Sequence, residues 1–373
     1  MRLLTRGAGA QAESPVLRRA GQYRGAMIDW KFAQRTAERW GRPGPEVSGP
    51  EVAAVVAELR DAATRAVQPV AEYTGLTAQV SSPVLVVDRP RWVAANLETF
   101  RTVMDPVTDK LTAGRSHRPS PVTAGMSAKI AGAELGGLMA FLSSKVLGQF
   151  DPFWEEGSAG GRLLLVAPNI LHVERELGVD PSDFRQWVCL HEETHRAQFT
   201  GVPWMRAHLR GLIDEFVDAT DLSEGAVGTA LGDALGEIVK IVRGQSDASL
   251  SDLFQNEQQT RVVDQMTGLM SLLEGHADVV MDVAGPDLIG SVSRIRRRFD
   301  QRRRGGSELS KIIRRLLGLE AKMSQYRDGA VFVRKVTSTV GEDGFAAVWA
   351  EPANLPSKAE IHDPDAWVAR VHG

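Results

Sequence analysis

The stretch GVDPSDFRQWVCLHEETHRAQFTGV (178–202) does most to decide the fold of this chain. Asp180 is a good N-cap, the proline after it fits the first helical position, and a second aspartate lies three residues beyond the cap. Gly201 is a natural C-terminal stop. Start and stop signals therefore predict a helix over residues 181–199.

That helix contains an H-E-x-x-H motif, His191-Glu192-Glu193-Thr194-His195. Residues four apart share one helix face, so both imidazoles can reach a single metal ion. Glu192 lies one step round the helix, where its carboxylate can approach a metal-bound water without binding the metal. That is the position of a general base. The chain has only eight histidines, which makes this spacing hard to attribute to chance, and we predict a metal site here.

A catalytic zinc usually has three protein ligands, and the segment GLMSLLEGHADVVMD (268–282) offers the third. Glu274 and Asp278 lie four apart on a helix expected over 257–283, on a side that is otherwise apolar. Buried carboxylates need a partner or a metal. We therefore expect Glu274 to bind the metal and Asp278 to accept the outer ring N–H of a ligating histidine. His276 is the rival third ligand, but it lies about 200° round the helix from Glu274; its alternative role is that of a core or surface histidine.

Most of the remaining sequence is typical of helices, and strand signals are few. Segments 145–154 and 161–170 flank a Gly/Ser-rich turn, and 163–166 is a short, continuous apolar run. We expect a hairpin or two neighbouring strands there, just upstream of the H-E-x-x-H helix. Such an edge can align an extended substrate. The predicted fold class is mainly α with a small β-sheet (α+β).

The chain divides into three parts on these grounds. Residues 1–26 are Arg-rich and lack the apolar core of a signal peptide, so we expect a disordered extension or a mis-assigned start before Met27. Residues 27–144 form an expected N-terminal helical region. Residues 145–373 form the expected metal-site region, with the strands, the two motif helices and further C-terminal helices.

Composition excludes several classes of function. Lys and Arg number 44 against 47 Asp and Glu, so the net charge of −3 argues against nucleic-acid binding as the main purpose. Seven arginines within 294–304 are expected to form a solvated face. A single cysteine, Cys189, rules out an internal disulfide and a four-cysteine zinc ribbon, and fits a reducing, cytoplasmic location. The most apolar stretch, 130–141, is too short to span a membrane, and we expect a buried helix.

Several segments together carry a family resemblance. H-E-x-x-H on one helix, with E-x-x-x-D on a later one, is similar to the gluzincin metallopeptidases. More narrowly, the chain resembles an actinobacterial zincin-like family of zinc-dependent metalloproteases or hydrolases, one branch of which is associated with deazaflavin coenzyme biosynthesis. The resemblance rests on MIDWKFAQRTAERW (27–40), VLGQFDPF (146–153), LLLVAPNI (163–170), HEETHRAQFTGVPWMRAHL (191–209), LLEGHADVVMD (272–282) and GLEAKMSQYRDGAVFV (318–333).

The resemblance implies a zincin-like metallopeptidase fold with helical additions, acting on a peptide or protein substrate. It implies zinc held by His191, His195 and Glu274, with Glu192 as the catalyst. Tyr326, in the last of the shared segments, is a candidate donor to the oxyanion, with packing as its alternative role. His195 and Glu274 are 79 residues apart in sequence (274 − 195), more than in thermolysin-like enzymes, so the helices between them form an insertion that could cap the site.

Three functional hypotheses follow. The first is a cytoplasmic zinc metallopeptidase in which Glu192 is the general base and acid. The second is a non-peptidase protein that keeps zinc as a structural or binding element, linked to coenzyme metabolism; the substitution Glu192→Gln separates it from the first. The third, a nucleic-acid or membrane-surface module acting through residues 294–304, is the least favoured.

Overall fold

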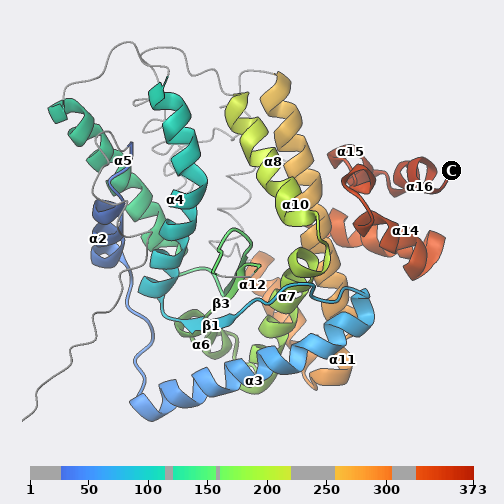
Figure 1. Cartoon of the computed structure of the whole chain (residues 1–373). Helices are drawn as coiled ribbons and strands as arrows, with labels where there is room; N and C mark the ends of the chain where they lie inside the picture. The colour runs from blue at the N-terminus through green and yellow to red at the C-terminus, as the bar shows by residue number, and fades with distance from the viewer. Residues whose placement is uncertain (1–26, 114–120, 157–159, 220–256, 305–324) are drawn as a thin grey trace, which may run out of the picture.

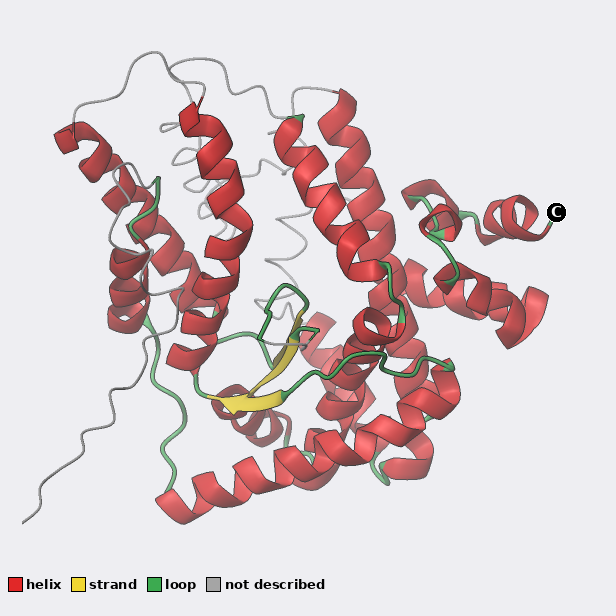
Figure 2. Ribbon diagram, viewed as in Figure 1, coloured by secondary structure: helices red, strands yellow, loops and turns green. Residues whose placement is uncertain are grey.

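A computed structural model gives the fold of the chain (Figure 1). The residues that it describes are 27–113, 121–156, 160–219, 257–304 and 325–373. Helices dominate, and a small three-stranded sheet lies among them (Figure 2). The predicted class, mainly α with a small sheet, is confirmed.

The elements follow one another along the chain with short connections in most places. In chain order they are α2 (Trp30–Trp40), α3 (Gly49–Thr74), β1 (Val84–Val87), α4 (Arg89–Ala113), α5 (Pro121–Leu142), β2 (Gly148–Asp151), β3 (Arg162–Val166), α6 (Ala167–Leu177), α7 (Pro181–Gly201), α8 (Met205–Asp218), α10 (Glu257–Val283), α11 (Gly285–Leu288), α12 (Val292–Arg304), α14 (Gln325–Ala346), the 3-10 turns η4 (Ala347–Trp349) and η5 (Pro352–Asn354), α15 (Lys358–His362) and α16 (Pro364–His372).

The sheet has the order β1-β3-β2, with β1 parallel and β2 antiparallel to β3. The predicted hairpin is confirmed: Phe150 on β2 is the register partner of Leu163 on β3. The strand expected as far as residue 170 is shorter than predicted. It ends at Val166, and α6 begins at the next residue. A proline in the first turn of α6 favours this start, because the first turn of a helix does not use the backbone N–H that proline lacks.

Strand β1 was not expected, and it lies within the predicted N-terminal helical region. Its sequence, VLVV, is an apolar run rich in β-branched residues between Pro83 and Asp88, which is a strand signal. From the same region, α3 packs against α7, with Val55 and Leu59 in the core that also holds Leu163. The sheet and this core therefore draw on both of the regions into which the sequence was divided.

Two hydrophobic cores lie on opposite faces of β3. Successive side chains of a strand point to opposite faces. Accordingly, Leu163 and Leu165 belong to the core formed with α3, α7, α10 and α14, and Leu164 and Val166 belong to the core formed with α2, α4 and α5. Figure 1 shows these two groups of helices on either side of the sheet.

The two motif helices form where the sequence predicts them. Asp180 caps α7 by accepting a hydrogen bond from the backbone N–H of Asp183 at 3.0 Å. Helix α10 spans the predicted residues 257–283. Helix α7 contacts both α3 and α10, and most of its residues are buried. It is thus held on both sides, which fixes the direction of its side chains.

The apolar stretch 130–141 lies in α5, which packs closely on α2. A Cβ at Gly136 would lie 2.3 Å from the carbonyl oxygen of Ala33, so only glycine permits this approach. The burial is one-sided, because Ile130 remains 52% exposed. No helix in the described ranges has the length and apolar character that crossing a membrane would require.

The arginine-rich segment forms α12, and part of it is used within the fold. Arg296 pairs with Asp282 at 2.5 Å, and Arg298 donates to the carbonyl oxygen of Leu177. These contacts attach α12 to α10 and α6. Arg296 and Arg298 therefore have partners within the protein, and their presence needs no nucleic-acid partner to explain it.

Candidate metal centre

Three predicted ligands meet in space although two helices supply them. The Nε2 atoms of His191 and His195, on α7, lie 3.2 Å apart. The carboxylate of Glu274, on α10, reaches both: Oε2 lies 3.7 Å from His191 Nε2, and Oε1 lies 3.7 Å from His195 Nε2. One ligand atom from each residue lies within 4.8 Å of the others, so this group could hold a metal ion.

The donor set fits zinc in both chemistry and spacing. Imidazole nitrogen and carboxylate oxygen are zinc donors, and two nitrogens about 2.0–2.1 Å from a tetrahedral zinc are about 3.3 Å apart. The observed 3.2 Å between the two Nε2 atoms matches that spacing. The side chains of His191 and Glu274 are 24% and 28% exposed, so the group is open on one side to water or a substrate.

Glu192 lies beside this group but is buried, with 6% exposure. Burial raises the pKa of its carboxyl from 4.5 to about 7; the neighbouring His195 lowers that pKa and Glu274 raises it. A carboxyl with a pKa near neutrality can both take up and release a proton at physiological pH. This is the balance that a general base and acid needs.

Strand β2 approaches the Glu192 side chain closely at Gly148, where a larger residue would force the carboxyl to shift. A Cβ at Gly148 would lie 2.5 Å from Cγ and Cδ of Glu192 and 2.7 Å from its Oε1. Since β2 pairs only with β3 in the described sheet, the Glu192 carboxyl lies against an edge strand.

The outer nitrogens of the two histidines have different neighbours. His195 Nδ1 lies 2.9 Å from Oε1 of Gln198, and His191 Nδ1 lies 3.2 Å from the sulfur of Met281. The partner found for His195 is therefore Gln198 and not Asp278. Asp278 follows Glu274 by one turn on α10, and its role beside a ligating histidine stays a prediction.

His276 takes the core role and lies outside the metal-ligand group. Its side chain is buried, and its ring packs against Phe345 and Trp349, with centroids 5.5 Å and 5.2 Å away. Burial, and secondarily the charge of His195, lowers its pKa to about 3, so the ring is neutral. Its Nδ1 lies 3.1 Å from the amide nitrogen of Gln198.

The family model described as "Zincin-like metallopeptidase" matches residues 28–368. The chain belongs to the zincin-like metallopeptidase family. No curated protein matches it.

One solved structure is similar to this family member over nearly its whole length. It is described as "a putative hydrolase with a novel fold from Chloroflexus aurantiacus", and it is 29% identical with a TM-score of 0.66. The match covers 92% of this chain and 98% of the other. The family and this neighbour together support a hydrolase. The actinobacterial branch and its association with deazaflavin coenzyme biosynthesis stay predictions.

Two predicted features of this zincin-like protein fall outside what the structure describes. Tyr326 lies in the first turn of α14, but its side chain is outside the described residues, and its oxyanion role stays a prediction. Between His195 and Glu274 the structure describes α8 and the start of α10. Residues 220–256 lie outside the described residues, so the expected capping insertion stays a prediction.

Sequence reasoning missed two residues of the site, and each had a signal. Gln198 follows His195 by three positions, which places it on the same face of α7. Gly148 interrupts an expected strand, and a glycine there often marks the close approach of another group. Neither signal is specific without the fold, because β2 and α10 are brought to α7 only by tertiary packing.

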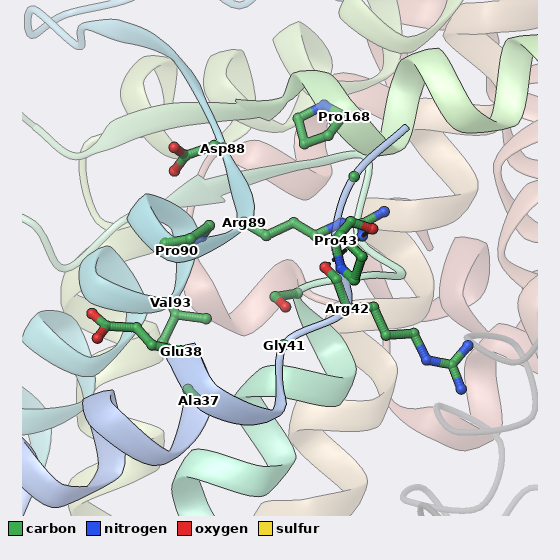
Figure 3. Close-up of a pocket in the computed structure, with 12 residues that line it drawn as sticks. Ala37, Glu38, Gly41, Arg42, Pro43, Asp88, Arg89, Pro90, Val93 and Pro168 are labelled. Carbon is green, nitrogen blue, oxygen red and sulfur yellow. Dashed lines mark hydrogen bonds between the residues drawn. The ribbon is translucent and has the colours of Figure 1, made fainter. Parts of the chain in front are cut away.

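A separate cavity of about 430 Å³ lies away from the metal centre, between the end of α2 and the starts of α4 and α6 (Figure 3). Arg89 crosses it, donating from Nε to Asn169 Oδ1 at 2.7 Å and from Nη1 to the carbonyl oxygens of Arg42 and Pro43 at 2.8 and 2.5 Å. No residue of the metal centre lines this cavity. Arg89 thus connects the segment after α2 to Asn169 at the start of α6.

Proposed function

We propose that this protein is a zinc-dependent peptidase. The observation that carries the proposal is the meeting of His191, His195 and Glu274 around one point, with the carboxyl of Glu192 beside them. Membership of the zincin-like family supports it. The division of roles also fits a peptidase. Three residues offer ligand atoms, and Glu192, next to His191 on α7, is buried and has a pKa of about 7.

In this proposal the two histidines and Glu274 hold zinc. A zinc ion bound there supplies Lewis acidity, which lowers the pKa of a water and polarises a carbonyl. Glu192 takes the proton that the attacking water loses and later gives it to the leaving amine, so the same carboxyl acts first as base and then as acid. Its burial raises the pKa of Glu192 to about 7 and thus makes both transfers accessible near neutral pH.

The substrate in this proposal is a peptide or protein segment in extended form. Strand β2 is an edge of the described sheet, and an extended peptide can add to such an edge through main-chain hydrogen bonds. Gly148 puts that edge against Glu192. A peptide that added beside β2 would therefore run past the base.

The test uses the variants Glu192→Gln and His195→Ala beside the wild type. Zinc content is measured by elemental mass spectrometry, and hydrolysis is followed on a peptide library. We expect about one zinc per wild-type chain, its loss in His195→Ala, and in Glu192→Gln retained zinc with hydrolysis reduced about 10²–10⁴-fold. Peptide hydrolysis that is unchanged in Glu192→Gln would refute the assigned base, and zinc without hydrolysis of any peptide would favour the non-peptidase alternative.

A further inference from the structure

A single buried amide connects the two helices that carry the candidate ligands. Gln198, on α7, is fully buried. Its Oε1 lies 2.9 Å from His195 Nδ1, and its Nε2 lies 3.0 Å from the carbonyl oxygen of Leu273 and 3.1 Å from His276 Nδ1. Leu273 directly precedes Glu274, so this amide joins one ligand on α7 to the backbone beside another on α10.

The direction of these hydrogen bonds is determined by the carbonyl group. A backbone carbonyl oxygen can only accept, so the group of Gln198 that faces Leu273 must be the NH₂ donor. The amide oxygen then faces His195, and because it can only accept, the Nδ1 of His195 must carry the proton. The neutral imidazole has one N–H, so the lone pair of His195 is left on Nε2, the atom that faces His191 and Glu274.

Both N–H groups of the same amide have acceptors. Its second N–H points to His276 Nδ1, and this requires His276 to accept there. Both amide hydrogens and the oxygen thus have partners, and flipping the amide would set its oxygen against the Leu273 carbonyl. Two acceptor oxygens that face each other in a buried site cannot form a hydrogen bond, so the observed orientation of the amide is the favoured one.

We propose that Gln198 is a positioning residue for the metal centre: it holds His195 in the tautomer whose Nε2 is free to bind metal and fixes the spacing between α7 and Glu274. This inference rests on the proposed zinc site. It assigns no contact between Gln198 and the metal or the substrate. Outer partners of ligating histidines commonly change metal affinity 10–100-fold when they are removed.

The fold supplies a matched control on the same helix. Gln186 is also buried on α7 and also makes hydrogen bonds in both directions, accepting from Arg65 Nε at 3.0 Å and donating to the carbonyl oxygen of Ala62 at 3.2 Å. These bonds join α7 to α3 and involve no candidate ligand. The substitution Gln186→Met therefore removes a comparable buried amide without touching the metal centre.

The experiment measures zinc affinity by competition with a chromophoric chelator for the wild type, Gln198→Met and Gln186→Met, with circular dichroism to show that each is folded. We expect zinc to bind Gln198→Met 10–100-fold more weakly than the wild type and Gln186→Met within about twofold of it. Equal affinities in the two variants would overturn the positioning role while leaving the zinc site intact. A wild type that binds no zinc would instead overturn the proposed function, and the positioning role with it.

A second measurement does not depend on any variant folding. In the zinc-free wild type, nitrogen NMR of the imidazoles reports which ring nitrogen of His195 is protonated. We expect the proton on Nδ1. A proton on Nε2 would overturn the inferred direction of the hydrogen bonds, whatever the zinc affinities are.

Discussion

The two faces of strand β3 support two different kinds of interior. Leu164 and Val166 face a core built with α2, α4 and α5, where close helix packing through Gly136 fills the space. Leu163 and Leu165 face the core of α7 and α10, and in that half the buried side chains include Glu192, Gln198 and His276.

The difference shows how buried polar groups are tolerated next to an apolar core. A buried polar group is costly unless it has partners. Gln198 has three, His276 accepts from it, and Glu192 responds to burial with a raised pKa. The α2/α4/α5 half, called the support below, has buried polar groups of its own, such as Arg162, which pairs with Asp151 and donates to the carbonyl oxygen of Ala95 on α4. It holds no residue of the candidate metal centre, whereas the α7/α10 half, called the site half, holds all of the candidate ligands. Independence of the two halves can be tested directly.

The largest expected effect is on the support. Leu164→Ala should lower the free energy of unfolding by about 2–5 kcal/mol, because the side chain is fully buried and its removal leaves a cavity. Leu163→Ala, on the other face of the same strand, is the matched comparison and should cost a similar amount. Both are measured by denaturant unfolding of the zinc-free protein.

The two leucine variants also test whether the faces are independent. Zinc affinity in the folded Leu164→Ala protein should stay within about threefold of the wild type, since the substituted side chain faces away from α7. A tenfold or greater loss of zinc affinity would show that the support and the site act as one unit.

The next effect is a pH dependence confined to the site half. The pKa of Glu192 is raised from 4.5 to about 7, so in this range the folded state binds more protons than the unfolded state. The stability of the zinc-free protein should therefore fall as pH rises from about 4.5 to 7, by up to about 3 kcal/mol from this group. Unfolding of wild type and Glu192→Gln is measured at each pH. The difference between them should change in this direction, and a difference that is flat or of opposite slope would contradict the buried carboxyl.

The smallest effect compares two glycines from the two halves. Gly148→Ala would place a methyl group against Glu192 and should lower the free energy of unfolding by about 1–3 kcal/mol. Gly125→Ala, on α5, meets nothing within 4 Å and should raise it by about 0.5–1 kcal/mol. Calorimetric melting temperatures give the two signs, and a neutral Gly148→Ala would show that β2 or the Glu192 side chain can shift to make room for the methyl group.

Local signals in the sequence were sufficient for the elements that carry the motifs. The cap at Asp180 and the apolar pattern of 257–283 predicted α7 and α10, and both formed there. Helical spacing within each segment placed the two histidines on one face of α7 and singled out Glu274 on α10. The two helix predictions succeeded because helix periodicity and capping depend on residues a few positions apart.

The sequence could not supply the contacts that cross between elements. Strand β1 is short, and its pairing with β3 joins residues about 80 positions apart. Nothing local marks Gln198 as the partner of His195.

By itself, then, the sequence determined the helices, the candidate donors and their types. Only the tertiary structure decided that Glu274 lies 3.7 Å from both histidines, that His276 faces the core, and that Gly148 lies against Glu192. The physical reason is that side-chain periodicity is a property of each element, whereas the meeting of two elements depends on the packing of all the others.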